Sequence, residues 1–402
     1  MRIVITGATG FIGHQIVPRL LAAGADLLLV GRYPDRLRST WPSVKSCDYA
    51  DLSRQATDYD LLLHLAVLNN DAPGAREEFE KVNIDLLLKV ARAAREAGVR
   101  RLLNVSSVQA LDGCNNSHYA CTKRAGDERL RKEVEGIGIT TVYLPLVYGD
   151  GWNGRVAFLN RLPRLIARGT FHVLAAFKPT LHVDEFVAQI LHELPCDGDD
   201  TVILAGDQDR NLVFASIKRL FDIAFAVSIL VGLWWLLFTV WLVVRLESPG
   251  PGLFVQERVG KHGRRFRCLK FRTMRMGTEQ AGTHEVSPAA VTRVGRFLRR
   301  TKLDELPQVW NILRNEVSLI GPRPCLPMQT RLIEARSARG VLKLTPGISG
   351  LAQINGVDMS TPDDLARWDA RYMALRSLLL DFSIVLSTGL GRGYGDPLQG
   401  AR

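Results

Sequence analysis

Hydrophobic positions in the first half of the chain alternate between short apolar runs and stretches where apolar residues recur every three or four positions. The short runs predict five strands, at residues 3–5, 26–30, 61–65, 102–105 and 140–144. Two periodic stretches between them, 14–23 and 84–97, predict helices that end at Gly24 and Gly98. Alternation of strands and helices predicts an α/β fold with a doubly wound parallel sheet.

One apolar run is much longer than the others. Residues 223–244 form 22 consecutive positions without a charged side chain, including Trp234, Trp235 and Trp241. A helix of this length can cross ~30 Å of hydrocarbon, so we expect membrane association rather than a buried core helix. After the run the chain is rich in Arg and Gly, with shorter helical stretches. We therefore predict three parts: an α/β domain at 1–210, a membrane helix at 211–247 and a small α-rich domain at 248–395.

Charge separates the same parts. The 402 residues carry a net charge of +11, with a balance of −1 over residues 1–210 and +12 over residues 211–402. A basic region favours phosphorylated substrates, an anionic membrane surface or nucleic acid. Nucleic acid is disfavoured because few aromatic residues that could stack on bases lie among the arginines. Six cysteines without a C-x-x-C pair exclude a disulfide scaffold or a zinc module.

A glycine-rich turn follows the first predicted strand. Gly7, Gly10 and Gly13 are spaced Gly-x-x-Gly-x-x-Gly directly before a helix. Such glycines let the backbone approach a pyrophosphate at the helix N-terminus, so the turn predicts a dinucleotide site. Arg32 follows the second strand, where an acidic residue would bind the NAD ribose and an arginine suits the NADP 2′-phosphate. NADP is therefore favoured over NAD, with a solvated arginine as the alternative.

A tyrosine and a lysine lie four residues apart on a predicted helix. Tyr119 and Lys123 then share one face, and the lysine cation is expected to lower the pKa of the phenol. Tyr119 can then exchange a proton with a sugar hydroxyl or ketone while hydride moves to or from a nicotinamide. A hydroxyl of Ser106 or Ser107, at a strand end, can hold the carbonyl oxygen.

Further motifs extend this pattern: Asp51-Leu52, Leu63-His64-Leu65-Ala66, Val82-Asn83, residues 145–149 (PLVYG) and residues 181–185 (LHVDE). With them, residues 1–205 resemble the extended short-chain dehydrogenases/reductases, in particular nucleotide-sugar epimerases and reductases. The resemblance implies a Rossmann fold and a catalytic set of Ser107, Tyr119 and Lys123. It also implies cofactor contacts from Gly7, Thr9, Gly10, Phe11, Ile12, Gly13, Arg32, Asp51 and Leu52.

Two departures from this family narrow the expected chemistry. Leu144 stands where the family has an arginine, and the C-terminal substrate lobe is shortened. Val108-Gln109 replaces the acidic pair of the 4,6-dehydratases, which disfavours dehydration. Ketone reduction or epimerisation of a nucleotide sugar is expected, with a non-catalytic module that binds NADP or nucleotide sugar as the alternative.

The basic half contains an ordered series of motifs. These are residues 250–254 (GPGLF), 256–260 (QERVG), 270–274 (KFRTM), 299–308 (RRTKLDELPQ), 318–324 (SLIGPRP) and 346–353 (PGISGLAQ). About residues 216–390 thereby resemble the bacterial sugar transferases, the monotopic polyprenyl-phosphate phosphoglycosyl transferases. Asp304 and Glu305 lie among basic residues, and a carboxylate can attack phosphorus only where the phosphate charge is neutralised. Surface salt bridging is the alternative for the pair.

The resemblance implies a role for each of these residues. Asp304 is the nucleophile that attacks the β-phosphate of a UDP-sugar and expels UMP, after which polyprenyl phosphate accepts the phosphosugar. Asp304 and Glu305 are the expected Mg²⁺ ligands. Lys270, Arg272 and Arg323 are the expected contacts to phosphate or uridine.

Basic residues flank the apolar run on both sides, so the positive-inside rule gives no direction. Both halves are expected to use cytosolic substrates, which favours a re-entrant hairpin over a span and places both on the cytoplasmic side of a bacterial inner membrane. The family breaks this helix with Ser-Pro, but this chain has Trp234-Trp235 there and no proline. The geometry of the hairpin is therefore left open. Whether the protein forms a homodimer is open as well.

Overall fold

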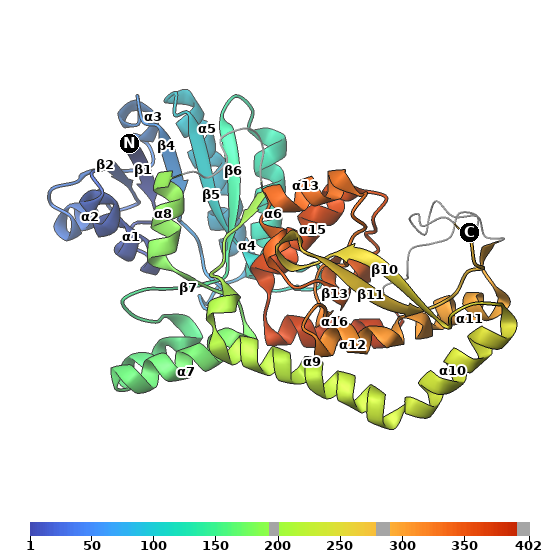
Figure 1. Ribbon diagram of the computed structural model, residues 1–402. Coiled ribbons are helices and arrows are strands. Elements are labelled where there is room, and N and C mark those ends of the chain that lie inside the picture. The colour runs from blue at the N-terminus through green and yellow to red at the C-terminus, as the bar shows by residue number, and fades with distance from the viewer. Residues whose placement is uncertain (193–200, 279–289, 392–402) are drawn as a thin grey trace. The chain divides into compact units, whose positions relative to one another are not determined.

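The computed structural model describes residues 1–192, 201–278 and 290–391 (Figure 1). The chain divides into two compact units. Unit 1 comprises Met1–Phe171 with Pro179–Gly206, and unit 2 comprises His172–Lys178 with Asp207–Arg402. Unit 1 thus ends close to the boundary expected at residue 210. The segment 172–178 belongs to unit 2, which no sequence pattern indicated.

Unit 1 is built on a seven-stranded parallel sheet, so the predicted fold class is confirmed. The strands are β1 (Arg2–Thr6), β2 (Asp26–Val30), β3 (Lys45–Cys47), β4 (Leu61–His64), β5 (Arg101–Ser107), β6 (Gly138–Leu144) and β9 (Thr201–Ile203). Their order is β3-β2-β1-β4-β5-β6-β9, which reverses between β1 and β4. In open α/β sheets the crevice at this reversal, beyond the carboxyl ends of the strands, is where ligands bind.

Helices cover both faces of this sheet (Figure 1). They are α1 (Phe11–Ala22), α2 (Pro34–Thr40), α3 (Leu52–Gln55), α4 (Arg76–Glu80), η1 (Lys81–Leu86), α5 (Leu87–Glu96), η2 (Val108–Leu111), α6 (His118–Glu133), η3 (Gly154–Arg161) and α8 (Val183–His192). Alternate residues of each strand enter two separate cores: Ile3 and Ile5 pack on one face, while Val4 packs on the other. Both faces are buried, which explains why the strands are continuous apolar runs. A small parallel pair, β7 (Leu146–Tyr148) and β8 (Thr180–His182), completes unit 1.

Unit 2 is mainly helical. Its helices are α9 (Leu212–Gly232), α10 (Trp234–Glu247), α11 (Arg293–Thr301), α12 (Val309–Leu313), α13 (Thr330–Ala338), α14 (Leu351–Ile354), α15 (Pro362–Leu375) and α16 (Leu378–Gly389), with short turns η4 (Gln208–Arg210), η5 (Lys261–Gly263), η7 (Leu303–Gln308) and η8 (Val341–Lys343). Two strand pairs were not expected from the sequence. These are an antiparallel hairpin, β10 (Leu253–Val259) with β11 (Arg265–Phe271), and a parallel pair, β12 (Ser318–Ile320) with β13 (Gly347–Ser349).

The long apolar run is broken into two helices. α9 and α10 are bent by 68° at Leu233, although no proline is present. No single helix in the described residues is long and apolar enough to cross a membrane, while this bent pair passes the same test of length and composition. Polar side chains of α9 hold it to the rest of unit 2. Arg219 donates to the carbonyl oxygens of Ile312 and Leu313 at 2.7 and 3.0 Å. Asp222 accepts from the backbone N–H of Leu319 at 2.8 Å.

Candidate functional sites

The glycine-rich turn lies in the crevice where the strand order reverses. Gly7 follows β1 with φ of +74°, and a Cβ there would come within 2.5 Å of the Ala66 nitrogen, in the loop after β4. A side chain is therefore excluded by both the backbone conformation and the space. α1 begins directly after Gly10 without a capping side chain and without an acidic residue in its first turn. Its free N–H groups suit an anion.

The residues predicted to contact the rest of the cofactor lie at the ends of neighbouring strands. Arg32 is exposed just after β2, with its charge close enough to Tyr49 to act on the pKa of that phenol. Asp51 and Leu52 lie at the start of α3, where Asp51 forms an ion pair with Arg54. The position of Arg32 at this edge suits a phosphate on the ribose, but the preference for NADP stays a prediction.

Ser107, Tyr119 and Lys123 come together in the structure. The Tyr119 hydroxyl hydrogen-bonds Ser107, and Lys123 donates from Nζ to the Val105 carbonyl oxygen at 2.8 Å. The expected lowering of the Tyr119 pKa by Lys123 is wrong for this geometry. Burial raises the pKa of Tyr119, and the Ser107 hydrogen bond only partly offsets it. Burial also lowers the pKa of Lys123. The neutral form is therefore more favourable for Lys123 than for an exposed lysine.

Sequence reasoning missed a buried carboxylate beside this set. Asp127 lies on the same face of α6 as Lys123, and its oxygens accept from Asn104 Nδ2 at 2.8 Å and Ser106 Oγ at 2.6 Å. Its charge favours the protonated form of Lys123. Ser106 is therefore occupied with Asp127, which leaves Ser107 as the hydroxyl next to Tyr119. The four-residue spacing from Lys123 could have indicated Asp127.

In unit 2 the paired carboxylates follow a left-handed residue. α11 ends at Thr301, and the residue after it, Lys302, has φ of +59°. The next residues form the 3₁₀ turn η7, which carries Asp304 and Glu305. A non-glycine residue in this region of φ is uncommon and occurs where surrounding structure holds it. The turn brings both carboxylates into the interior, where Asp304 is 9 % exposed.

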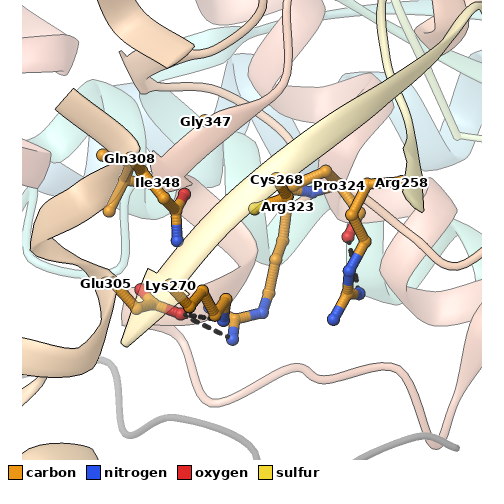
Figure 2. Close-up of a pocket in the computed structure, with 9 residues that line it drawn as sticks. All are labelled: Arg258, Cys268, Lys270, Glu305, Gln308, Arg323, Pro324, Gly347 and Ile348. Atoms are coloured by element: carbon orange, nitrogen blue, oxygen red, sulfur yellow. Dashed lines mark hydrogen bonds and ion pairs between the residues drawn. The ribbon is translucent and has the colours of Figure 1, made fainter. Parts of the chain in front are cut away.

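Two cations hold the second carboxylate. Glu305 Oε1 accepts from Lys270 Nζ at 2.7 Å and from Arg323 Nη2 at 3.2 Å, as Figure 2 shows. Burial opposes ionisation of Glu305, but Lys270 and Arg323 outweigh it and lower its pKa to about 2. Lys270 comes from β11, whereas Arg323 follows β12. Exposed acidic pairs form weak surface bridges, whereas the side chains of this triad are only 13–17 % exposed. A catalytic role for the pair stays a prediction.

The first carboxylate behaves differently. Burial and the neighbouring Glu305 charge raise the pKa of Asp304 to about 6, against the opposing effect of Lys270 and other cations. Asp304 is thus mostly ionised at neutral pH, but it is the more basic member of the pair. Adjacent carboxylates whose environments push their pKa values apart are suited to different tasks.

A shallow cavity opens beside this triad (Figure 2). Its lining residues are Arg258, Cys268, Lys270, Glu305, Gln308, Arg323, Pro324, Gly347 and Ile348. Two of the three expected phosphate contacts, Lys270 and Arg323, therefore face one cavity with Glu305. Arg258, which the sequence did not single out, adds a third cation and is held by the Pro324 carbonyl oxygen at 3.1 Å.

The third expected phosphate contact lies elsewhere. Arg272 is 5 % exposed and donates to the carbonyl oxygens of Ser248, Pro249 and Val244. Arginine is suited to binding several carbonyl oxygens at the end of a helix, and these bonds fix the chain just after α10. The geometry favours a structural role for Arg272 over contact with phosphate.

Backbone contacts set the walls of the cavity. Asn311, fully buried on α12, accepts from the Leu269 N–H at 3.1 Å and donates to the Arg267 carbonyl oxygen at 2.8 Å, which fixes the register of β11 next to η7. A Cβ on Gly347 would lie 2.0 Å from the Gly321 nitrogen. The motifs 318–324 and 346–353 thus run side by side as the parallel pair β12–β13 with their backbones in contact, which explains the glycine in each.

No group of three or more His, Cys, Asp or Glu side chains that could hold a metal occurs in the described residues. Mg²⁺ usually takes one or two protein carboxylates together with substrate phosphates. Glu305 lines the cavity, whereas Asp304 precedes it in η7 and is not among the lining residues. Two adjacent carboxylates, one of them in the cavity, fit this mode.

The fold and the two sites define a chain that joins a dinucleotide-type α/β unit to a helical unit with paired carboxylates among cations. Sequence models of two families match it: the NAD dependent epimerase/dehydratase family over residues 3–215 and the bacterial sugar transferases over residues 213–391. The chain belongs to both families, one in each half, as their motifs predicted.

Curated relatives match part of the chain. The UDP-glucose:undecaprenyl-phosphate glucose-1-phosphate transferase of Xanthomonas campestris pv. campestris is 38% identical over 197 residues, 46% of this chain and 40% of that protein. A putative undecaprenyl-phosphate N-acetylgalactosaminyl 1-phosphate transferase of Bacillus subtilis (strain 168) is 41% identical over 124 residues, 30% of this chain and 69% of that protein. The chain spans less than half the length of the first three relatives: 40%, 35% and 43%.

Solved structures match the first half. The crystal structure of UDP-N-acetylglucosamine 4-epimerase from Bacillus cereus has a TM-score of 0.41 and 20% sequence identity, covering 52% of this chain and 76% of that one.

Proposed function

We propose that the chain is a bifunctional membrane enzyme whose second half transfers a phosphosugar from a UDP-sugar to polyprenyl phosphate. The observation that carries this proposal is Glu305, which lines a cavity with Lys270, Arg323 and Arg258 and directly follows the buried Asp304 in the chain. Membership of the bacterial sugar transferases and the activities named for the relatives support it. Which sugar is transferred stays open.

Asp304 is the nucleophile in this proposal. Its carboxylate oxygen forms a bond to the β-phosphorus of the UDP-sugar, and the bond from that phosphorus to the UMP oxygen breaks, so that UMP leaves. An oxygen of polyprenyl phosphate then bonds to the same phosphorus and displaces the Asp304 carboxylate. The electron pair of each broken bond stays with the leaving oxygen.

The cations of the cavity neutralise the phosphate charge that would otherwise repel Asp304. Lys270 and Arg323 face the cavity and can move from Glu305 to phosphate oxygens over a short distance, because both already lie at its edge. Mg²⁺ bound by the two carboxylates and the diphosphate would stabilise the negative charge on the leaving UMP.

The bent pair α9–α10 is proposed as the re-entrant membrane element. Many of its large apolar side chains are exposed, among them Val231 at 72 %, Trp234 at 64 % and Leu246 at 77 %. The 68° bend at Leu233 supports a hairpin without the proline of the family. Both halves would then face the cytoplasm of a bacterial cell.

The first half is proposed to act as an NADP-dependent reductase or epimerase on a nucleotide sugar. Tyr119 would donate or accept the proton at the sugar oxygen, and Ser107 would hold that oxygen. The alternative, a module that binds without catalysis, keeps the same crevice.

The transferase is tested on the full chain in bilayer nanodiscs. UDP-sugars and undecaprenyl phosphate should yield UMP and lipid-linked phosphosugar, and Asp304→Asn should abolish both. Asp364→Asn, an exposed partner of Arg367, is the matched control and should retain the rate. Equal UMP release by Asp304→Asn and the control would refute the nucleophile assignment.

The first half is tested by turnover of UDP-keto-sugars with NADPH, followed by mass spectrometry. Tyr119→Phe should stop turnover, while Tyr33→Phe, which changes a 70 % exposed tyrosine, should not. Turnover that persists in Tyr119→Phe, or no turnover by the parent chain with any UDP-keto-sugar, would favour the binding module.

A further inference from the structure

Two oppositely charged side chains are buried between α13 and α15 of unit 2. Arg336 of α13 and Asp369 of α15 are each 3 % exposed. Arg336 donates from Nε to Oδ2 of Asp369 at 2.9 Å, and its Nη2 lies 2.7 Å from the same oxygen. Neither residue lines the cavity. Burial of an ion pair adds little stability, because lost hydration offsets the attraction, so stability alone does not account for this pair.

The remaining nitrogen of Arg336 contacts the backbone of a cavity residue. Nη1 donates to the carbonyl oxygen of Arg323 at 2.9 Å, while Nε and Nη2 face Asp369. Asp369 thus orients the planar guanidinium of Arg336, and that guanidinium holds the Arg323 peptide. The Arg323 side chain donates to Glu305 at 3.2 Å, as Figure 2 shows. A continuous series of contacts therefore leads from α15 through α13 to the cavity.

The segment that carries Arg323 is held through its carbonyl oxygens. Pro322 and Pro324 have no N–H group that could donate. The carbonyl oxygens of residues 322–325 accept, in chain order, from the Gly347 N–H at 2.8 Å, Arg336 Nη1 at 2.9 Å, Arg258 Nη1 at 3.1 Å and the Val259 N–H at 2.9 Å. Arg336 supplies the contact at Arg323 itself, so its loss frees the peptide from which that side chain extends.

We infer that Arg336 and Asp369 are positioning residues of the transferase site, which hold Arg323 where it neutralises a phosphate of the UDP-sugar. The inference rests on the transfer proposed above. Neither residue touches the substrate, and both act through the Arg323 backbone. A shift of that backbone moves the guanidinium at the end of its side chain, and small displacements of a charge beside a reacting phosphate are costly. The opposing hypothesis is that the pair only joins α13 to α15.

Replacement of both charges separates positioning from folding. Removal of one partner destabilises a protein because the other charge stays buried alone, whereas apolar replacement of both is often neutral. Arg336→Met with Asp369→Leu should therefore melt close to the parent temperature in detergent. Its kcat/KM for UMP release from UDP-sugar should fall roughly 10- to 100-fold. A folded double variant with the parent kcat/KM would overturn the inference.

Arg336→Lys keeps the test decisive if the apolar pair does not fold. The charge opposite Asp369 remains, but one ammonium replaces a fork that contacts Asp369 and the Arg323 carbonyl through different edges. We expect a folded protein with a lower kcat/KM, and an unchanged kcat/KM would contradict the inference.

The matched control is Arg331→Gln. It breaks an exposed ion pair with Asp363 between the same two helices and should keep the parent rate. An equal loss in Arg331→Gln would assign the effect to the helix contact and also overturn the inference.

Coupling to Arg323 is the readout that a merely structural pair does not change. In Arg323→Gln the side chain to be positioned is gone, so addition of Arg336→Lys should lower kcat/KM much less than it does in the parent. Equal fold losses in both backgrounds would show that Arg336 acts independently of Arg323 and would overturn the inference. If the parent chain releases no UMP from any UDP-sugar, the proposed transfer itself is refuted, and this inference with it.

Discussion

Replacing Glu305 by Gln should make Asp304 more acidic. Glu305 is the second largest cause, after burial, of the rise in the Asp304 pKa from 3.8 to about 6. That rise is about 2 units, or ~3 kcal/mol of preference for the protonated form. Glu305→Gln removes one negative charge and also frees Lys270 and Arg323 to interact with Asp304. Both effects lower the pKa, and we expect a shift of about one unit, since burial is unchanged.

The assay is the first half-reaction, UMP release from UDP-sugar without polyprenyl phosphate. The acceptor is omitted because a phosphate monoester itself titrates near pH 6. The reaction needs the Asp304 carboxylate, so the parent rate should fall below about pH 6, the value to which burial and Glu305 raise the Asp304 pKa. In Glu305→Gln the acid limb should move down by about one unit, whatever happens to the plateau rate.

The opposite variant gives the matched control. Lys270→Gln removes a cation that lowers the Asp304 pKa, so its acid limb should move up, although its plateau also falls. If Glu305→Gln left the acid limb in place or raised it, the pKa of Asp304 would not depend on Glu305 in the way the geometry requires. If both variants moved the limb in the same direction, electrostatic control of Asp304 by this triad would be refuted.

Three further predictions concern stability and cofactor choice. Asn311→Ala removes buried hydrogen bonds to β11 and should lower the free energy of unfolding by ~3 kcal/mol, measured as a lower melting temperature in detergent. Asn355→Ala, at an exposed position, should change the melting temperature little. In Gly7→Ala the new Cβ would clash with the Ala66 backbone, and alanine would be strained at this positive φ, so NADPH binding measured by fluorescence should be lost. Gly169→Ala, at a helical position with open space around it, should bind NADPH normally. Arg32→Ala should weaken NADPH binding more than NADH binding, and an equal loss for both would show that Arg32 contacts no 2′-phosphate.

Local pattern was sufficient for much of unit 1. The five predicted strands are present, and residues 26–30 match β2 in both bounds. The helix predicted at 14–23 runs from Phe11 to Ala22 and contains Pro18, which is exposed. The short strands β3 and β9 were missed, since three residues carry too little periodicity to stand out.

Pattern was less informative in unit 2. In the hairpin β10–β11, arginines interrupt the alternation of polar and apolar residues, so the sequence did not predict these two strands. The break at Leu233 was also not predictable, because the chain there has neither a proline nor a run of polar residues.

The sequence by itself determined the two families and their order along the chain, and it supplied the candidate site residues, because motifs depend on residue types at fixed spacings. Tertiary structure alone decided which of those residues meet. Lys270 and Arg323, 53 positions apart in the numbering, reach one carboxylate, while Arg272, two positions from Lys270, turns to the end of α10. Residues two positions apart in a strand share a face, but β11 ends at Phe271, so Arg272 lies beyond the strand and its partners are set by distant segments. Tertiary structure also decided the pKa values of Asp304 and Tyr119, because burial in the fold raises both.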